Sequence, residues 1–84
     1  MRVAVSYLGP TASFSGTTSD ALEFDRPVTV KDIIDIIAHL HGYRFDGRAW
    51  AVLINGRGIP TQRWETTCVT EDSQVTILPL LSGG

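Results

Sequence analysis

Residues 29–42 have the sequence TVKDIIDIIAHLHG, and this stretch decides the fold class. Thr29 can cap the N-terminus of a helix, and Asp32 stands three residues later, where its side chain can return the hydrogen bond in a capping box. Apolar residues then recur at helical spacing, at Val30, Ile33, Ile34, Ile37 and Leu40. Gly42 favours a helix end. The pattern predicts one amphipathic helix over residues 30–41 with a single buried stripe.

Short apolar runs on both sides of this helix predict strands. The runs lie at residues 2–8, 21–25, 49–54 and 75–78. The first alternates apolar side chains with period two, and the third is apolar almost throughout, which is typical of a largely buried strand. Pro79 follows the last run and lacks an amide donor, so strand pairing should stop there. One helix between strands predicts an α+β fold of two layers, with the helix packed on one face of a sheet.

The connecting segments are rich in turn residues. Residues 9–19 are expected to form a surface loop that carries Phe14. Asn55-Gly56 predicts a hairpin turn, with a short partner strand at Ile59-Pro60 on the sheet edge. Residues 64–69 are expected to form an irregular or short-strand crossover before a turn at 71–73.

Composition limits the classes of function. A chain of 84 residues with 43% hydrophobic residues can build one domain with its own core. The net charge of −2 has no long run of one sign, so nucleic acid is not expected as a partner. The N-terminal apolar run is too short for a signal or membrane helix. The single Cys68, expected to be a packed side chain, excludes an internal disulfide and fits a cytoplasmic protein.

The end of the chain carries the functional signal. Residues 1–79 are predicted to form the folded body and residues 80–84, LLSGG, a flexible tail. Glycine has no Cβ, so Gly83 and Gly84 give a thin end that can enter a narrow channel. The Gly84 carboxylate becomes a good acyl donor only after activation, for example as an acyl adenylate. The alternative is a frayed terminus or a linker, since Ser-Gly-Gly is also a common flexible segment.

Motifs along the chain resemble those of a known family. They are Ile54-Asn55 at a strand end, Ile59-Pro60 followed by Trp64, Glu71 to Val75 before the last strand, and Gly83-Gly84. Together they resemble the MoaD/ThiS family of ubiquitin-like sulfur carriers. Asp72-Ser73 lacks the glycine that is usual in that turn. The resemblance implies the β-grasp fold, with a mixed sheet of four to five strands and one main helix.

The resemblance also implies a mechanism. An ATP-dependent adenylyltransferase related to ubiquitin-activating enzymes would adenylate Gly84, and a persulfide sulfur donor would convert it to a thiocarboxylate. A sulfur-accepting synthase subunit would then receive the sulfur. Gly84 would be the reacting residue, Gly83 would give clearance, and Ser82 belongs to the same tail. The chain would be a carrier and not an enzyme, binding no cofactor of its own because the activating enzyme uses the ATP.

No metal site is predicted, because His39 and His41 are two residues apart and point to different sides of a helix. Leu80 and Leu81 are candidates for binding a partner groove, with packing along their own sheet edge as the alternative. Trp64 and Phe14 are further candidates for partner binding. For both aromatic residues the alternative is packing on their own domain.

Two pathways and two other classes of protein remain open. Pro79 and the long loop at 9–19 favour the molybdopterin pathway, which is preferred, whereas Pro60 and Trp64 favour the thiamine thiazole pathway. The chain could instead be a protein modifier conjugated through Gly84. It could also be a noncovalent β-grasp interaction module whose glycines have no chemical role.

Overall fold

The computed structural model describes residues 1–42 and 50–79, apart from the side chains of Ser13 and Phe14. The elements in chain order are β1 (Arg2–Tyr7), α1 (Pro10–Ser15), β2 (Ser19–Glu23), β3 (Val28–Thr29), α2 (Val30–His41), β4 (Trp50–Ile54), β5 (Arg57–Gly58), the 3₁₀ turn η1 (Thr61–Arg63), β6 (Cys68–Val69) and β7 (Ser73–Pro79). The predicted residue Ala49 lies outside the described residues.

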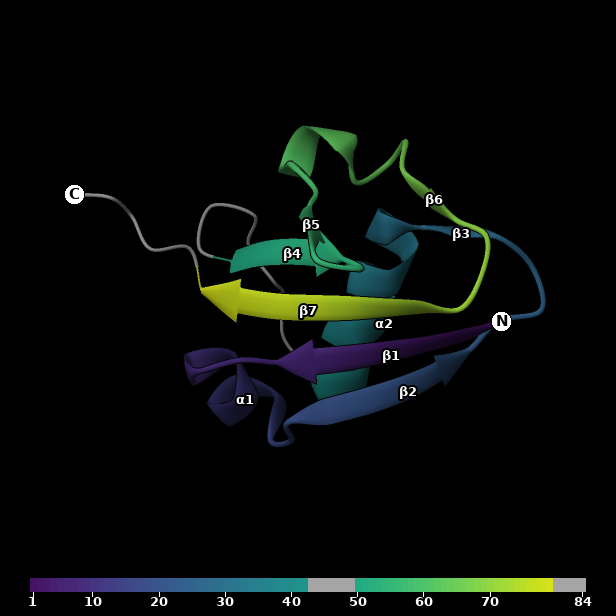
Figure 1. Cartoon of the computed structure of the whole chain (residues 1–84). Coiled ribbons are helices and arrows are strands. Elements are labelled where there is room, and N and C mark those ends of the chain that lie inside the picture. The colour runs from purple at the N-terminus through teal and green to yellow at the C-terminus, as the bar shows by residue number, and fades with distance from the viewer. Residues whose placement is uncertain (43–49, 80–84) are drawn as a thin grey trace.

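Within this part of the chain, five strands form a mixed sheet in the order β2-β1-β7-β4-β5 (Figure 1). The central strands β1 and β7 are parallel, and the other pairs are antiparallel. The helix α2 lies across one face of this sheet, and β3 pairs with β6 in a separate two-stranded sheet. The prediction of an α+β fold with four to five strands in a mixed sheet and one main helix on one face is confirmed.

The helix α2 has the predicted bounds and the predicted cap. The Oγ1 of Thr29 accepts a hydrogen bond from the Asp32 amide, and the Thr29 amide donates to Oδ2 of Asp32, both at 3.0 Å. Val30, Ile33, Ile34 and Ile37 are buried. Leu40 was expected in the buried stripe but is 55% exposed. A helix turns about 100° per residue, so His41 and not Leu40 falls near the centre of the buried stripe in the last turn.

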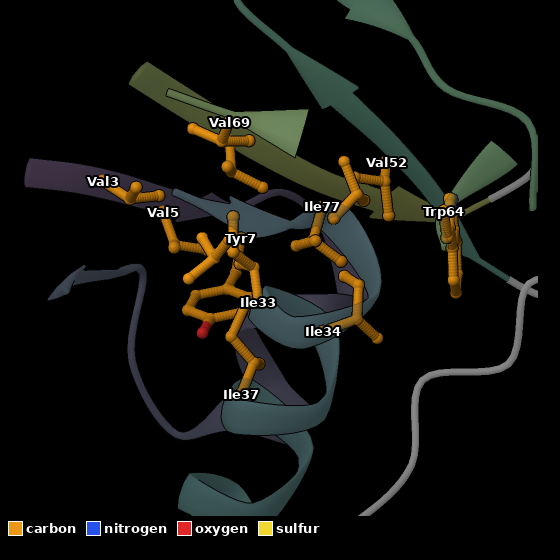
Figure 2. Close-up of a cluster of buried hydrophobic side chains, with 13 residues drawn as sticks. Val3, Val5, Tyr7, Ile33, Ile34, Ile37, Val52, Trp64, Val69 and Ile77 are labelled. Carbon is orange, nitrogen blue, oxygen red and sulfur yellow. The ribbon is translucent and has the colours of Figure 1, made fainter. Parts of the chain in front are cut away.

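The core lies between α2 and the inner face of the sheet (Figure 2). Alternate residues of β1 and β7 point into it, as the period-two pattern predicts. The largest fully buried side chains include Tyr7, Ile33, Ile37 and Ile77. The indole of Trp64 joins the same cluster. This layer of side chains fixes the position of β7, the strand that leads to the tail.

Four predicted details of the connections need correction. Residues 9–19 contain the helix α1, and β2 begins at Ser19, two residues before the predicted strand. The partner strand of the hairpin is Arg57–Gly58 and not Ile59-Pro60. Asn55 and Gly56 both have positive φ, 51° and 83°, and a two-residue turn of this kind pairs Ile54 with Arg57. Cys68 is exposed, because β6 directs Val69 inward instead.

A partly buried polar cluster joins α2 to β1 and β2. Oδ2 of Asp20 accepts a hydrogen bond from the Tyr7 hydroxyl at 2.6 Å and lies 2.7 Å from Nε2 of His41. The rings of Tyr7 and His41 meet edge to face, with centroids 5.6 Å apart. The sequence pattern did not reveal this cluster, because its three members come from three separate elements.

Candidate functional site

The candidate site is the C-terminal end of β7, the strand that precedes the predicted tail at residues 80–84. The strand β7 lies between β1 and β4, and its last residues, Leu78 and Pro79, pair with Ala51 and Trp50 of β4. We call Ile77, Leu78 and Pro79 the tail root. Because the root lies in the middle of the sheet, neighbours on both sides hold it. The body therefore holds the tail root in a fixed position.

The short helix α1 secures the other side of the tail root. Thr11 is completely buried, and its Oγ1 lies 2.6 Å from the Leu8 carbonyl oxygen and 3.1 Å from that of Ile77. The Leu8 amide also donates to the Ile77 carbonyl at 2.9 Å. Gly9 makes the turn into α1 with φ 59° and ψ −136°, a conformation that side chains disfavour. A Cβ on Gly9 would lie 4.0 Å from Cδ of Pro79, so this turn passes close to the root.

No sequence pattern singles out Thr11. A threonine among several in a segment rich in Ser, Thr and Gly carries no pattern that separates it from its neighbours. The only local signal was Gly9-Pro10, because proline is favoured in the first turn of a helix. Its role depends on a contact with a strand 66 residues away, which a local pattern cannot show.

A small apolar patch lies beside the tail root on the sheet face opposite α2. Strand register places Ala51 next to Leu78, and Leu53 next to Thr76, while their neighbours Val52 and Ile77 point into the core. Leu8 follows the outward positions of β1 and is 49% exposed. We call Leu8, Ala51, Leu53 and Leu78 the outer patch. It offers a partner an apolar surface close to the point where the tail begins.

The predicted site residues divide into two groups. Leu80, Leu81, Ser82, Gly83 and Gly84 lie outside the described residues, as does the Phe14 side chain. Trp64 is described and is 7% exposed, with its Nε1 donating to the Ile59 carbonyl at 3.0 Å. The structure thus gives Trp64 the core position that was the alternative interpretation. Any partner contact it makes is limited to that small exposed fraction.

Trp64 also lines a mainly apolar cavity of about 240 Å³ together with Trp50, Ile59 and Pro60. Because Trp50 pairs with Pro79, this cavity lies on the β4 side of the tail root. The predicted Pro60 and Trp64 motif therefore builds the wall of the body next to the root. It does not bring a titratable group there.

The described residues show no chemistry of their own at the root. Among them, no group of three or more His, Cys, Asp or Glu side chains is placed to hold a metal. The resolved pKa shifts belong to α2. A hydrogen bond from the Thr29 backbone lowers the pKa of Asp32, and the hydrogen bond to Asp35 raises the pKa of Lys31. No helix of the described residues is long and apolar enough to cross a bilayer.

Comparison with solved structures shows that the chain has the β-grasp fold. A putative molybdopterin converting factor, subunit 1, from Pyrococcus furiosus matches with a TM-score of 0.77 and 20% identity, over 96% of this chain and 99% of that chain. SAMP1 from Haloferax volcanii matches with a TM-score of 0.75 and 19% identity, over 100% of both chains. The thiamine biosynthesis protein ThiS from Geobacter metallireducens matches at 0.62 and 15%, over 100% of both.

The model of the ThiS family matches residues 5–84, and the chain belongs to this family. Its members are small sulfur carriers and not enzymes, so the predicted class of function is confirmed at the level of the family. The family also implies an activating enzyme of the ubiquitin-activator type as a partner. Among curated proteins, no sequence matches this chain.

Proposed function

We propose that this chain carries sulfur for molybdopterin biosynthesis as a thiocarboxylate on Gly84. The observation that most supports sulfur carriage is the extent of the family match, which runs from residue 5 through the diglycine at residue 84. The body then serves recognition, and the chemistry takes place at the end of the tail. The fixed tail root fits this division, because a flexible segment reaches an active site more efficiently when its starting point is held.

The proposed chemistry has three steps. The Gly84 carboxylate attacks the α-phosphate of ATP on the activating enzyme, and pyrophosphate leaves. The terminal sulfur of a persulfide donor attacks the acyl carbon, and AMP leaves. A thiol then cleaves the sulfur–sulfur bond of the acyl persulfide, so the thiol is oxidised and Gly84 keeps the sulfur as a thiocarboxylate. The carrier contributes only its terminal carboxylate and a narrow end. Gly83 has no side chain that could block the channel of the partner enzyme.

Partner recognition is assigned to the surfaces next to the tail. The outer patch lies beside the tail root, and Leu80 and Leu81 follow Pro79 directly in the sequence. A partner that buries the outer patch and the two leucines would gain apolar contact area at the place where it must also hold the tail. Leu8 is the most exposed described member of this surface. The activating enzyme and the synthase subunit would use it in turn, in the cytoplasm.

The first experiment measures the intact mass of the chain after incubation with ATP, a persulfide donor and a ubiquitin-activator-type adenylyltransferase. The expected product is heavier by the replacement of one oxygen by sulfur. A chain lacking Gly84 should gain no mass, while Ser82→Ala should react like the unaltered chain. If the natural protein continues beyond residue 84, or if a blocked terminus still delivers sulfur, the proposed role of Gly84 is wrong.

The second experiment decides the pathway. The thiocarboxylate form is offered to a molybdopterin synthase large subunit and, separately, to a thiazole synthase. We expect sulfur transfer to the first, because Pro79 and the 9–19 segment favour that type. Transfer to the thiazole synthase alone would assign the chain to thiamine, as Pro60 and Trp64 favour.

A protein modifier is the second candidate, because SAMP1 from Haloferax volcanii, a small archaeal modifier protein, shares the fold with a TM-score of 0.75. Activation of Gly84 would be the same, and a lysine amine instead of a sulfur would take the acyl group. Against this, Leu80, Leu81 and Ser82 lack the arginines that precede the diglycine in ubiquitin-type tails. Conjugates on a blot of cell extract, lost when Gly84 is removed, would favour the modifier.

A further inference from the structure

The strand β2 forms one edge of the five-stranded sheet. The amides of Phe24 and Tyr7 bond to Met1 and Thr18, so the β1–β2 hydrogen bonds involve the even-numbered residues of β2. Antiparallel pairing alternates inward and outward backbone groups. The amide and carbonyl groups of Ala21 and Glu23 therefore point away from β1. Within residues 1–42 and 50–79, no further strand pairs with them.

The neighbouring flank of α2 exposes two large apolar side chains. Ile36 is 39% exposed and Leu40 is 55% exposed, and their spacing of four residues places them on the same flank. Ile36 lines an open cavity of about 790 Å³ together with Phe24, which directly follows β2, and Val28, the first residue of β3. At the other end of this flank, His41 contacts Asp20 of β2. The exposed pair therefore lies beside the open edge.

Charge distinguishes this region from the rest of the molecule. Residues 20–35 contain five of the nine carboxylates and two of the seven cations, so this segment carries more negative charge than the whole chain. Four of the five carboxylates line the cavity, at Glu23, Asp25, Asp32 and Asp35, beside the single cation Arg26. Some already have partners, since Lys31 bridges to Asp35 at 2.9 Å and Arg2 to Glu23 at 3.5 Å. Both bridges are solvent-exposed and contribute little, so a partner's cations can replace them.

We propose that this groove, formed by the edge of β2 and the Ile36–Leu40 flank of α2, binds an extended segment of another protein. The segment adds a strand to β2 through the backbone of Ala21 and Glu23. Its apolar side chains on the helix side pack against Ile36 and Leu40. A lysine or arginine at its end lies among Asp25, Asp32 and Asp35. Strand addition supplies affinity through main-chain hydrogen bonds, and the pocket and its charges supply specificity.

The groove and the tail root lie at different places on the molecule. The root is at the end of β7, whereas the cavity is at the connection from β2 to β3, beside the start of β1 (Figure 1). A partner in the groove therefore leaves the root and the outer patch accessible. The carrier can then be held by one protein while its tail reacts in another. The inference about the groove rests on the edge and the flank, and not on the chemistry of Gly84.

The test selects peptides from a random dodecamer library displayed on phage, with the unaltered chain as bait. Counter-selection uses the double variant Ile36→Glu/Leu40→Glu, which changes only exposed positions and so should keep its fold, as an amide NMR spectrum can verify. We expect enriched peptides with alternating apolar residues and a terminal lysine or arginine. Their affinity should fall about tenfold or more in the double variant. Enrichment of no peptide that depends on Ile36 and Leu40 would overturn the proposal.

NMR titration of an enriched peptide into the ¹⁵N-labelled chain tests the binding mode. The amide signals of Ala21 and Glu23 should shift and become protected from hydrogen exchange, because they gain hydrogen bonds. Shifts centred on Leu8 and Leu78 instead would show that the peptide binds the outer patch, and would refute the proposed groove. Asp25→Lys should weaken binding of the basic peptide, and Glu71→Lys, a matched change outside the cavity lining, should weaken it less.

A mass assay separates this inference from the proposed function. The double variant should accept sulfur at Gly84 at the same rate as the unaltered chain, within about twofold, because the groove is not part of the tail root. Peptide binding without sulfur uptake would support the groove alone. Sulfur uptake without Ile36-dependent peptide binding would support the carrier function alone.

Discussion

The two α-helices of the described chain are specified in different ways. The twelve residues of α2 are specified by local sequence signals, namely a capping box at Thr29 and Asp32 and an apolar stripe. The six residues of α1 have neither a side-chain cap nor a long enough stripe. An isolated helix of this length is not stable in water. Thr11 connects α1 to β7, through the contacts of its hydroxyl with the carbonyl oxygens of Leu8 and Ile77.

The two helices also differ in what they support. The helix α2 builds the core, so its sequence pattern is strong and its bounds are predictable. The helix α1 supports the tail root, and its determinants lie in the fold around it. If this contrast is correct, substitutions in α2 should follow burial and capping rules. A substitution in α1 should be measurable mainly through its contact with β7.

The largest effect is expected for Ile37→Ala. Ile37 is fully buried on α2, so removing three carbon atoms should lower the free energy of unfolding by about 2–5 kcal/mol. Leu40→Ala is the matched control on the same helix and should cost well under 1 kcal/mol, because Leu40 is 55% exposed. Urea unfolding followed by circular dichroism measures both. Equal losses for the two variants would contradict the assignment of the buried stripe.

The next effect is expected for Thr11→Val, which keeps the shape of the side chain and removes its hydroxyl. The Leu8 and Ile77 carbonyl oxygens share the single hydroxyl proton, and each also accepts from a backbone amide, so the free energy of unfolding should fall by about 1.5 kcal/mol, the upper end for one buried hydrogen bond. Thr18→Val is a control in the same segment, because Thr18 is exposed. Hydrogen exchange should also become faster at residues 10–15 than at α2. A uniform change over both helices would count against a local role for Thr11.

The sequence was sufficient for the parts of the fold that follow local rules. The periodicity of β1, the cap of α2 and the Asn55-Gly56 turn each depend on residues a few positions apart, and each was predicted. Cys68 and Leu40 were placed wrongly, because the exposure of a side chain at an element's end depends on which neighbour faces the core. The helix α1 and the Tyr7–Asp20–His41 cluster depend on distant contacts and could not be predicted.

The candidate site shows the same division. Gly83 and Gly84 are predicted from a short diglycine motif that needs no knowledge of the fold, and because they lie outside the described residues they stay a prediction. The features that position the tail, Thr11 and the pairing of Trp50 with Pro79, required the sheet order. The groove beside β2 required it too, because only the sheet order shows that β2 is an edge.

A smaller effect is expected for Thr29→Ala, which tests the contribution of the N-terminal cap to α2. Loss of the cap should lower the free energy of unfolding by about 1 kcal/mol, since the Asp32 amide loses its acceptor. For a domain of this size, that corresponds to a fall in melting temperature of roughly 4–8 °C. Thr29→Ser should restore most of it, because serine also caps. If Thr29→Ser is as unstable as Thr29→Ala, packing of the Thr29 methyl group and not the cap is responsible.

The smallest effect is expected in the pH dependence of the same cap. A hydrogen bond from the Thr29 backbone lowers the pKa of Asp32 below its ordinary value of 3.8, so the unfolded chain binds this proton more readily than the folded chain does. The stabilisation by Asp32 is therefore present above pH 3.8 and is lost as the pH falls through the lower folded-state pKa. In Asp32→Asn, the deficit in melting temperature relative to the unaltered chain should be clear at pH 7 and should shrink towards pH 2. Glu71→Gln removes one carboxylate elsewhere and corrects for net charge. A deficit that stays constant with pH would mean that the charge of Asp32 does not stabilise the cap. The apolar stripe would then be the main local signal that specifies α2.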